Sequence, residues 1–94
     1  MIRMMVELRV KAGEVEAVET ALRAYVGAVH KHEPLTELQA FRRGAEPVYV
    51  QVMGFPDEET AQRHRRCSYT RRFMEEVMPR CETDPQAIPL TLIG

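Results

Sequence analysis

The first ten residues alternate between apolar and mostly charged side chains. The even positions hold the apolar residues Ile2, Met4, Val6, Leu8 and Val10. Successive side chains of a strand point to opposite faces, so this period of two predicts a strand with an apolar even-numbered face. The Lys-Ala-Gly sequence at positions 11–13 then interrupts the pattern.

A helical period begins at Glu14 and predicts a helix of about 18 residues. Its apolar stripe consists of Val15, Val18, Leu22, Tyr25, Val26 and Val29. Glutamates occupy the first turns and basic side chains occupy the last turn, where the helix dipole favours each sign of charge. Pro34 cannot continue the helix and disfavours helical geometry at Glu33, so we expect the helix to end there.

Two short strands are predicted next, over residues 36–43 and 48–55. The second, Val48 to Phe55, has the β-branched and aromatic content of a buried strand. The turn sequence Gly44 to Pro47 lies between them, which predicts a hairpin.

The C-terminal half predicts further helix and a last strand. Asp57 can cap a helix whose apolar stripe is formed by Ala61, His64, Cys67 and Ser68. A second stripe, with Phe73, Met74, Val77 and Met78, ends at Pro79. The two stripes are reconciled by a kink or break near residues 68–69. Residues 87–93 complete the chain as a short strand.

The order of elements is therefore β-α-β-β-α-β, which predicts a single α+β domain over residues 1–94 with the ferredoxin-like fold. Both helices should cover one face of a four-stranded antiparallel sheet, against the even-numbered face of the first strand. On the other face we expect apolar side chains beside two polar ones: Met5, Phe41, Tyr49, Met53 and Phe55, with Glu7 and Gln51. Such a face is a liability in water, so we predict a homodimer whose sheets face each other around a cavity.

Composition narrows the class of protein. The chain has 94 residues and a net charge of −1, so it lacks the basic excess typical of a nucleic-acid-binding domain. No apolar stretch approaches the roughly 18 residues that span a bilayer, and charges interrupt the apolar N-terminal run, unlike in a signal peptide. The two cysteines, Cys67 and Cys81, form no disulfide framework. We therefore expect a cytoplasmic protein that binds neither nucleic acid nor membrane.

The whole chain resembles the antibiotic biosynthesis monooxygenase (ABM) superfamily. The resemblance is carried by the order of elements, by Glu33-Pro34, by the Val-Tyr-Val-Gln-Val sequence at positions 48–52, and by His64-x-x-x-Ser68 followed by Phe73. It implies a dimeric α/β barrel with a pocket between sheet and helices in each subunit. Some members oxidise polyketide-like aromatics or quinols without a cofactor, and others degrade haem.

The sequence departs from the active members at several positions. Gln51 replaces the usual glutamate of the third strand, Met53 replaces a frequent tryptophan, and the chain has no tryptophan at all. Leu35 replaces the glycine that often follows Glu-Pro. Glu7 and Glu76 stand near the asparagine and histidine expected of a haem-degrading member. The resemblance thus implies the fold but does not transfer a complete set of catalytic residues.

His64 and Glu7 are the candidate catalytic residues. An imidazole with an ordinary pKa of about 6.5 can accept a proton from a phenolic substrate at neutral pH; alternatively, His64 braces its helix against a neighbouring loop. A Glu7 carboxylate among apolar side chains would have a raised pKa, as a buried acid or base requires. The alternative for Glu7 is an ion pair across the dimer with an arginine such as Arg3, Arg9 or Arg42.

The candidate substrate-binding residues are Met5, Phe41, Tyr49, Gln51, Met53, Ser68 and Phe73. Tyr49 and Gln51 could orient a ring, although Tyr49 suits cross-strand packing equally well. No metal site is expected. His64 and Cys67 share a helix face, but His30 and His32, two residues apart, point away from each other.

Three functions remain open at this point. The first is a monooxygenase that needs no cofactor and oxidises a small aromatic or quinol with O₂. The second is a non-catalytic homodimer that binds a small hydrophobic ligand. The third is a partner-binding module that uses the basic sequence Arg-His-Arg-Arg at positions 63–66, with Arg71 and Arg72 beyond it.

Overall fold

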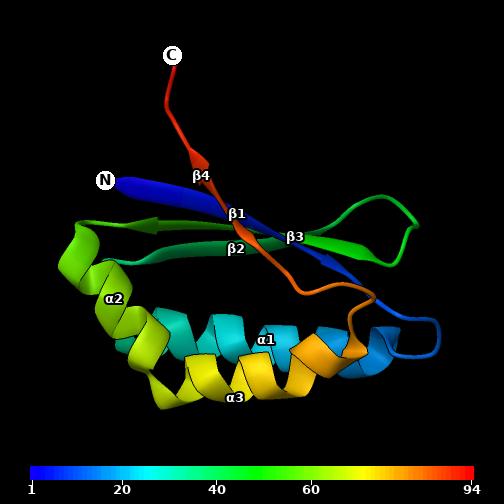
Figure 1. The fold of residues 1–94 in the computed structure, drawn as a ribbon. Helices are drawn as coiled ribbons and strands as arrows, with labels where there is room; N and C mark the ends of the chain where they lie inside the picture. Colours follow the sequence, from blue (N-terminus) through cyan, green and yellow to red (C-terminus); the bar gives the residue numbers. More distant parts are fainter.

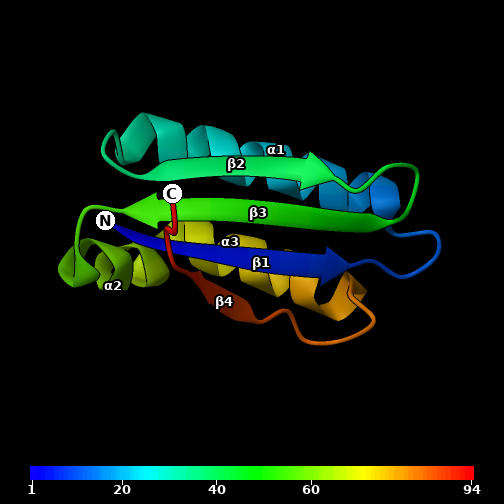
Figure 2. The same ribbon diagram turned by 90° about the horizontal axis from the view of Figure 1, so that it is seen from above.

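The computed structural model describes the whole chain, from Met1 to Gly94. It has two layers, an antiparallel sheet and a set of helices that all cover the same face of the sheet (Figure 1). The strands are β1 (Ile2–Arg9), β2 (Glu37–Arg42), β3 (Val48–Phe55) and β4 (Ala87–Leu90). They lie in the order β2-β3-β1-β4, visible from above in Figure 2. The predicted ferredoxin-like α+β fold is confirmed.

Helix α1 (Val15–His32) has the predicted length and position. Val18, Leu22, Tyr25 and Val29 of its apolar stripe are buried against the sheet and the other helices. Burial of this stripe, rather than a side-chain cap, holds the helix, since Glu14 makes no capping hydrogen bond. None of the helices is both long and apolar enough to traverse a lipid bilayer.

The C-terminal helical region consists of two helices, α2 (Glu58–Arg66) and α3 (Ser68–Val77). The Asp57 carboxylate accepts a hydrogen bond from the Thr60 backbone N–H at 2.8 Å and begins α2 as predicted. Cys67 between the helices has extended backbone geometry, with φ −63° and ψ 144°. The expected break therefore lies one residue earlier than predicted. A short 3₁₀ helix, η1 (Met78–Arg80), follows α3.

The register of β1 and β3 decides which side chains face the helices. Val6 lies opposite Gln51, Met4 opposite Met53 and Leu8 opposite Tyr49. Residues directly opposite each other share a face, so the odd-numbered residues of β3 lie on the helix-covered face. The expectation that Tyr49, Gln51, Met53 and Phe55 point away from the helices is therefore wrong. Both faces of β3 are apolar, so alternation could not decide between them.

The face of the sheet away from the helices is apolar at its centre. We call it the outer face; its apolar residues are Met5, Phe41, Val50, Val52, Ile88 and Leu90. Phe41 is 52% exposed, Ile88 47% and Leu90 40%. Strand β4 is shorter than predicted, and residues 91–94 leave the sheet on the side away from the helices (Figure 1).

Candidate functional site

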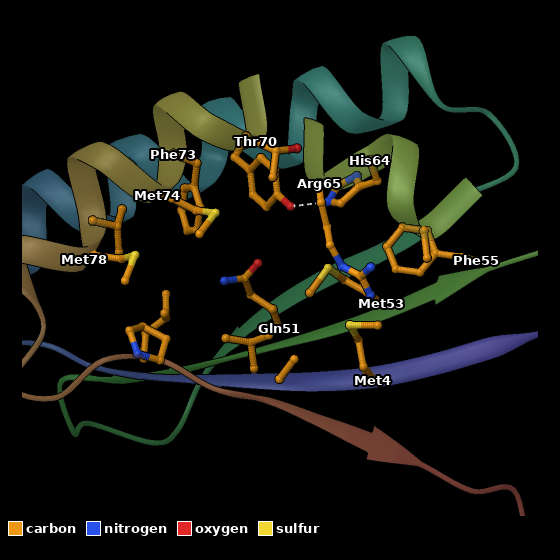
Figure 3. Close-up of a pocket in the computed structure, with 17 residues that line it drawn as sticks. Met4, Gln51, Met53, Phe55, His64, Arg65, Thr70, Phe73, Met74 and Met78 are labelled. Atoms are coloured by element: carbon orange, nitrogen blue, oxygen red, sulfur yellow. Dashed lines mark hydrogen bonds between the residues drawn. The ribbon is translucent and has the colours of Figure 1, made fainter. Parts of the chain in front are cut away.

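A cavity of about 240 Å³ lies between the sheet and the helices. Figure 3 shows side chains that line it from both layers. Most are apolar, and four of them are methionines: Met4, Met53, Met74 and Met78. Methionine is flexible and polarisable, so such walls adapt to differently shaped apolar ligands. The cavity is therefore suited to a small, largely apolar molecule.

Few polar groups reach this cavity. Gln51 stands near the middle of the sheet and directs its side-chain amide into the cavity (Figure 3). Arg65 of α2 is the one arginine or lysine in the lining, and its side chain is half exposed. On the helix side, His64, Tyr25 and Thr70 complete the polar set. A few polar groups in an apolar cavity orient a ligand rather than merely enclose it.

His64 is held between a phenol and a carboxylate. Its Nε2 lies 2.5 Å from Tyr25 Oη, and its Nδ1 lies 2.8 Å from Glu33 Oε2. An ionised carboxylate only accepts hydrogen bonds, so Nδ1 carries a proton and donates it to Glu33. In the neutral ring Nε2 then accepts the hydrogen bond of the Tyr25 hydroxyl. The phenol, the imidazole and the carboxylate form one chain of hydrogen bonds, which we call the Tyr25–His64–Glu33 chain.

The Glu33 carboxylate receives further hydrogen bonds on both oxygens. The Tyr69 hydroxyl donates to Oε2, and the Thr36 hydroxyl donates to Oε1 at 3.0 Å. Burial acts to raise the pKa of Glu33, but the hydrogen bonds from Tyr69 and His64 outweigh it and hold that pKa below its ordinary value. Glu33 is therefore an anion at neutral pH and accepts the hydrogen bond of His64 Nδ1.

Tyr25 is fixed in place and remains a neutral phenol. Its ring stacks on Phe73, with centroids 4.4 Å apart and planes inclined by 13°. Burial, helped by the negative charge of Glu33, raises the pKa of Tyr25 well above its ordinary value. The neighbouring Thr70 hydroxyl acts in the opposite direction on this pKa, yet Thr70 Oγ1 is buried without a hydrogen-bond partner.

A separate surface groove lies on the other side of His64. Its lining includes His32, Glu33, Thr36, Arg63 and Tyr69. The rings of His32 and Tyr69 stack there, 5.7 Å apart. His64 lines both this groove and the cavity, so its imidazole is part of the wall between them.

The structure brings four of the predicted site residues to the cavity: His64, Gln51, Met53 and Phe73. Tyr49 lies on the same sheet face but outside the cavity, and its hydroxyl donates to Glu19 at 2.5 Å. Hydrogen bonding from Tyr49 lowers the pKa of Glu19. Ser68 lines the surface groove instead.

The other three predicted site residues, Glu7, Met5 and Phe41, lie on the outer face. Glu7 is opposite Val50, so the expectation that it stands beside Gln51 in the pocket is wrong. The carboxylate instead lies 3.3 Å from Arg9 and 3.8 Å from Arg43. These ion pairs lie within one chain, whereas the expected pair was one across the dimer; Arg9 is among the expected partners.

Sequence reasoning missed Tyr25, Thr70 and the side-chain role of Glu33. Tyr25 fits the apolar stripe of α1, and its partner His64 is 39 residues away in the chain. In the sequence, Glu33 is marked only by the proline that follows it, which ends the helix and forms the Glu33-Pro34 pair of the resemblance. A tyrosine within an apolar stripe does carry a signal, because a buried hydroxyl requires a hydrogen-bond partner.

His30 and the basic sequence of α2 have interaction partners within the chain. His30 interacts through Nε2 with the Leu38 carbonyl at 2.9 Å, and no three His, Cys, Asp or Glu side chains converge anywhere in the structure. In the basic sequence of α2, Arg63 and Arg65 each lie 3.7 Å from a glutamate of the same helix. Exposed pairs of this kind are typical of a solvated helix face.

The sequence profile of the antibiotic biosynthesis monooxygenase family matches residues 1–76. The chain belongs to the ABM family. Among curated proteins, none matches this ABM protein closely enough to count as a relative.

Solved structures agree on the ABM fold. An antibiotic biosynthesis monooxygenase superposes with a TM-score of 0.90 at 17% identity, each chain covered fully. A candidate antibiotic biosynthesis monooxygenase of Nitrosomonas europaea superposes with a TM-score of 0.90 at 16% sequence identity, again with full coverage of both chains. A candidate monooxygenase of the same kind from Caulobacter crescentus superposes with a TM-score of 0.89 at 18% sequence identity. The superposition covers 99% of this chain and 90% of the other. At such identities the likeness establishes the fold and not the reaction.

Proposed function

We propose that this ABM-family protein oxidises a small hydroxylated aromatic, such as a phenol or quinol, directly with O₂. The observation that carries the proposal is the Tyr25–His64–Glu33 chain in the wall of an apolar cavity. A buried imidazole backed by a carboxylate is the arrangement that lets a histidine act as a general base. Family membership supports the choice of reaction.

Deprotonation activates the substrate. The substrate hydroxyl gives its proton to Tyr25 Oη as the Tyr25 proton moves to His64 Nε2, and Glu33 stabilises the resulting imidazolium. The phenolate then adds O₂ at a ring carbon that bears hydrogen, forming a carbon–oxygen bond and a peroxide anion. His64 returns its proton to the peroxide. Loss of that C–H proton and cleavage of the O–O bond release water and leave a carbonyl.

The atoms and electrons of this reaction balance without another reductant. One hydroxyarene and one O₂ give one quinone and one water, and the substrate supplies all four electrons that reduce O₂. The apolar wall excludes water from the anionic intermediates. Gln51 directs its amide into the cavity from the sheet side (Figure 3), where it can orient a second oxygen of the substrate.

Oxygen consumption tests this function. Naphthols and quinols are supplied under ¹⁸O₂, oxygen uptake is followed with an electrode, and products are analysed by mass spectrometry. We expect substrate-dependent uptake and a quinone carrying one ¹⁸O atom. A compound that binds in the cavity without any uptake contradicts the proposal.

That contradicting result would support the second candidate, a non-catalytic protein that binds a small hydrophobic ligand. The observation in its favour is the chemistry of β3, where Gln51 and Met53 provide an amide and a thioether in place of the glutamate and tryptophan that the resemblance implies for active members. The same cavity serves both functions, and only turnover separates them.

We also infer that two copies pair through their outer faces. Exposed Phe41, Ile88 and Leu90 form an apolar surface that a second sheet can cover. The segment after β4 supports this pairing, because it extends away from the helices (Figure 1) and carries the exposed side chains of Leu92 and Ile93. The ion pairs of Glu7 lie at the edge of the same surface.

A further inference from the structure

Gln51 is a buried polar side chain without a partner in the chain. It is only 2% exposed, and its amide points into the cavity (Figure 3). Neither polar atom of this amide makes a hydrogen bond, and neither is fully enclosed, so both are accessible from the cavity. A buried amide without a partner is costly, so its presence points to a ligand that brings a polar group into the cavity.

The lining of the cavity carries one permanent charge, that of Arg65. No aspartate or glutamate is among the lining residues, and His64 is the other basic side chain there. The Glu33 carboxylate behind His64 lines the surface groove instead, where hydrogen bonds from three side chains satisfy it. The charges around the cavity therefore favour a ligand that brings a negative group to Arg65.

The guanidinium of Arg65 is available for such a group. It makes no hydrogen bond within the chain, and the one carboxylate that pairs with it, that of Glu58, lies 3.7 Å away. More than half of each of these two side chains is exposed, so their ion pair is weak. Figure 3 shows the Arg65 side chain extending from α2 toward the sheet. A planar guanidinium can hold both oxygens of a carboxylate through two parallel hydrogen bonds.

We propose that Arg65 binds a carboxylate group of the ligand, so that the cavity takes an aromatic acid in preference to a neutral aromatic of the same shape. The apolar interior holds the rings. Because Arg65 is half exposed, the carboxylate bound to it keeps contact with water, which avoids the cost of burying its charge. The proposal rests on the proposed function and names its substrate class more closely: a phenol or quinol that also bears a carboxylate.

Binding of three matched probes tests this assignment without relying on turnover. The probes are 6-hydroxy-2-naphthoate, its neutral carboxamide and 2-naphthol, which share a two-ring skeleton and one hydroxyl group. Affinities are measured by calorimetry under anaerobic conditions at neutral pH, where the acid is ionised. For the unaltered protein we expect the acid to bind at least about tenfold more tightly than the amide, as for hydrogen bonds between charged groups.

Substitutions of Arg65 assign the preference to this residue. Arg65→Gln removes the charge and should lower the preference for the acid to about threefold or less. Arg65→Glu reverses the charge, so the amide should then bind more tightly than the acid. Circular dichroism confirms that each variant is folded, and an affinity for 2-naphthol within about threefold of the original shows that the apolar part of the cavity is intact.

Arg63 offers a matched control on the same helix. It pairs with Glu59 and lines the surface groove rather than the cavity. Arg63→Glu changes the net charge of the protein by the same amount as Arg65→Glu, yet it should leave all three affinities within about twofold, because solvent and salt screen an exposed charge.

Several results would overturn the role of Arg65: equal affinity for the acid and the amide, an undiminished preference in folded Arg65→Gln, equal losses in Arg65→Glu and Arg63→Glu, or no binding of any probe. Failure of the proposed function gives a different pattern. A preference for the acid without oxygen uptake keeps the role of Arg65 and contradicts the monooxygenase, whereas uptake with 2-naphthol and no preference for the acid does the reverse.

Discussion

The Nδ1 atom of His64 lies 2.8 Å from Oε2 of Glu33, although 31 residues separate the two in the chain. Glu33 is the residue at which α1 ends, and His64 is near the end of α2. The break at Cys67 starts α3 so that Tyr69 also reaches the carboxylate. One anion thus joins three helices in the surface groove, on the other side of His64 from the cavity.

Removing the charge of Glu33 should change the proton arrangement of His64. In Glu33→Gln the amide can donate as well as accept, so it no longer requires a proton on Nδ1. We expect the neutral ring to lose its uniform Nδ1–H form, which ¹⁵N NMR of the imidazole reports directly. Glu59→Gln, an exposed change on α2, serves as the control. A spectrum of Glu33→Gln identical to that of the unaltered protein would contradict the hydrogen-bond assignment.

The same carboxylate should make stability depend on pH in acid. Its pKa is lowered in the folded protein, so the unfolded chain binds protons first as the pH falls. The stabilisation is complete above the ordinary pKa of about 4.5 and is lost as the pH falls through the lower folded value. The difference in free energy of unfolding between the protein and Glu33→Gln should be constant from pH 6 to 5 and shrink below about pH 4.5. If the difference in free energy of unfolding instead grows below about pH 4.5, the pKa of Glu33 is not lowered in the folded protein.

Oxygen uptake should separate the two catalytic candidates of the sequence. His64→Ala removes the base behind Tyr25 and should lower uptake at least about tenfold. Glu7→Gln alters an outer-face ion pair and should leave uptake within about twofold. The measurement is an oxygen electrode at saturating naphthol or quinol. Equal losses in the two variants would show that the outer face takes part in the reaction.

Association should depend on Phe41. Phe41→Glu places a charge on the apolar outer face, at its β2 edge, and should reduce the solution mass from about twice 10.8 kDa to 10.8 kDa in light scattering. Leu35→Glu makes the same kind of change at a residue that is 72% exposed but lies away from that face, and it should remain dimeric. A monomeric unaltered protein would leave the exposed apolar surface without the proposed cover.

Local patterns were sufficient for the elements of this fold. The stripe of α1, the Asp57 cap and the alternation of β1 each depend on neighbours in the chain, and each is found where it was predicted. The face of β3 depends instead on its register with β1. Val50 and Val52 on one face and Gln51 and Met53 on the other are about equally compatible with burial, so the pairing of Val6 with Gln51 had to come from the structure.

The site was less predictable for a related reason. His64 could be chosen from its chemistry, but the groups that give it a proton arrangement lie on α1 and α3. Tyr25 has the same position in the α1 stripe as an ordinary core residue. Its function depends on one hydrogen bond across 39 residues, which no local pattern contains.

The hydroxyl groups of Tyr25 and Thr70 should affect the free energy of unfolding with opposite signs. Thr70→Val replaces a buried, unpartnered hydroxyl with a methyl group of similar shape, so the free energy of unfolding should rise by about 1 kcal/mol. Tyr25→Phe removes the donor to His64 Nε2 and leaves that buried nitrogen unpaired, which should cost about 1–3 kcal/mol.

Urea denaturation at pH 7 measures both changes, with the exposed Thr20→Val on α1 as a control that should change little. If Thr70→Val loses more than about 1 kcal/mol, the hydroxyl has a partner in the free protein, such as an ordered water.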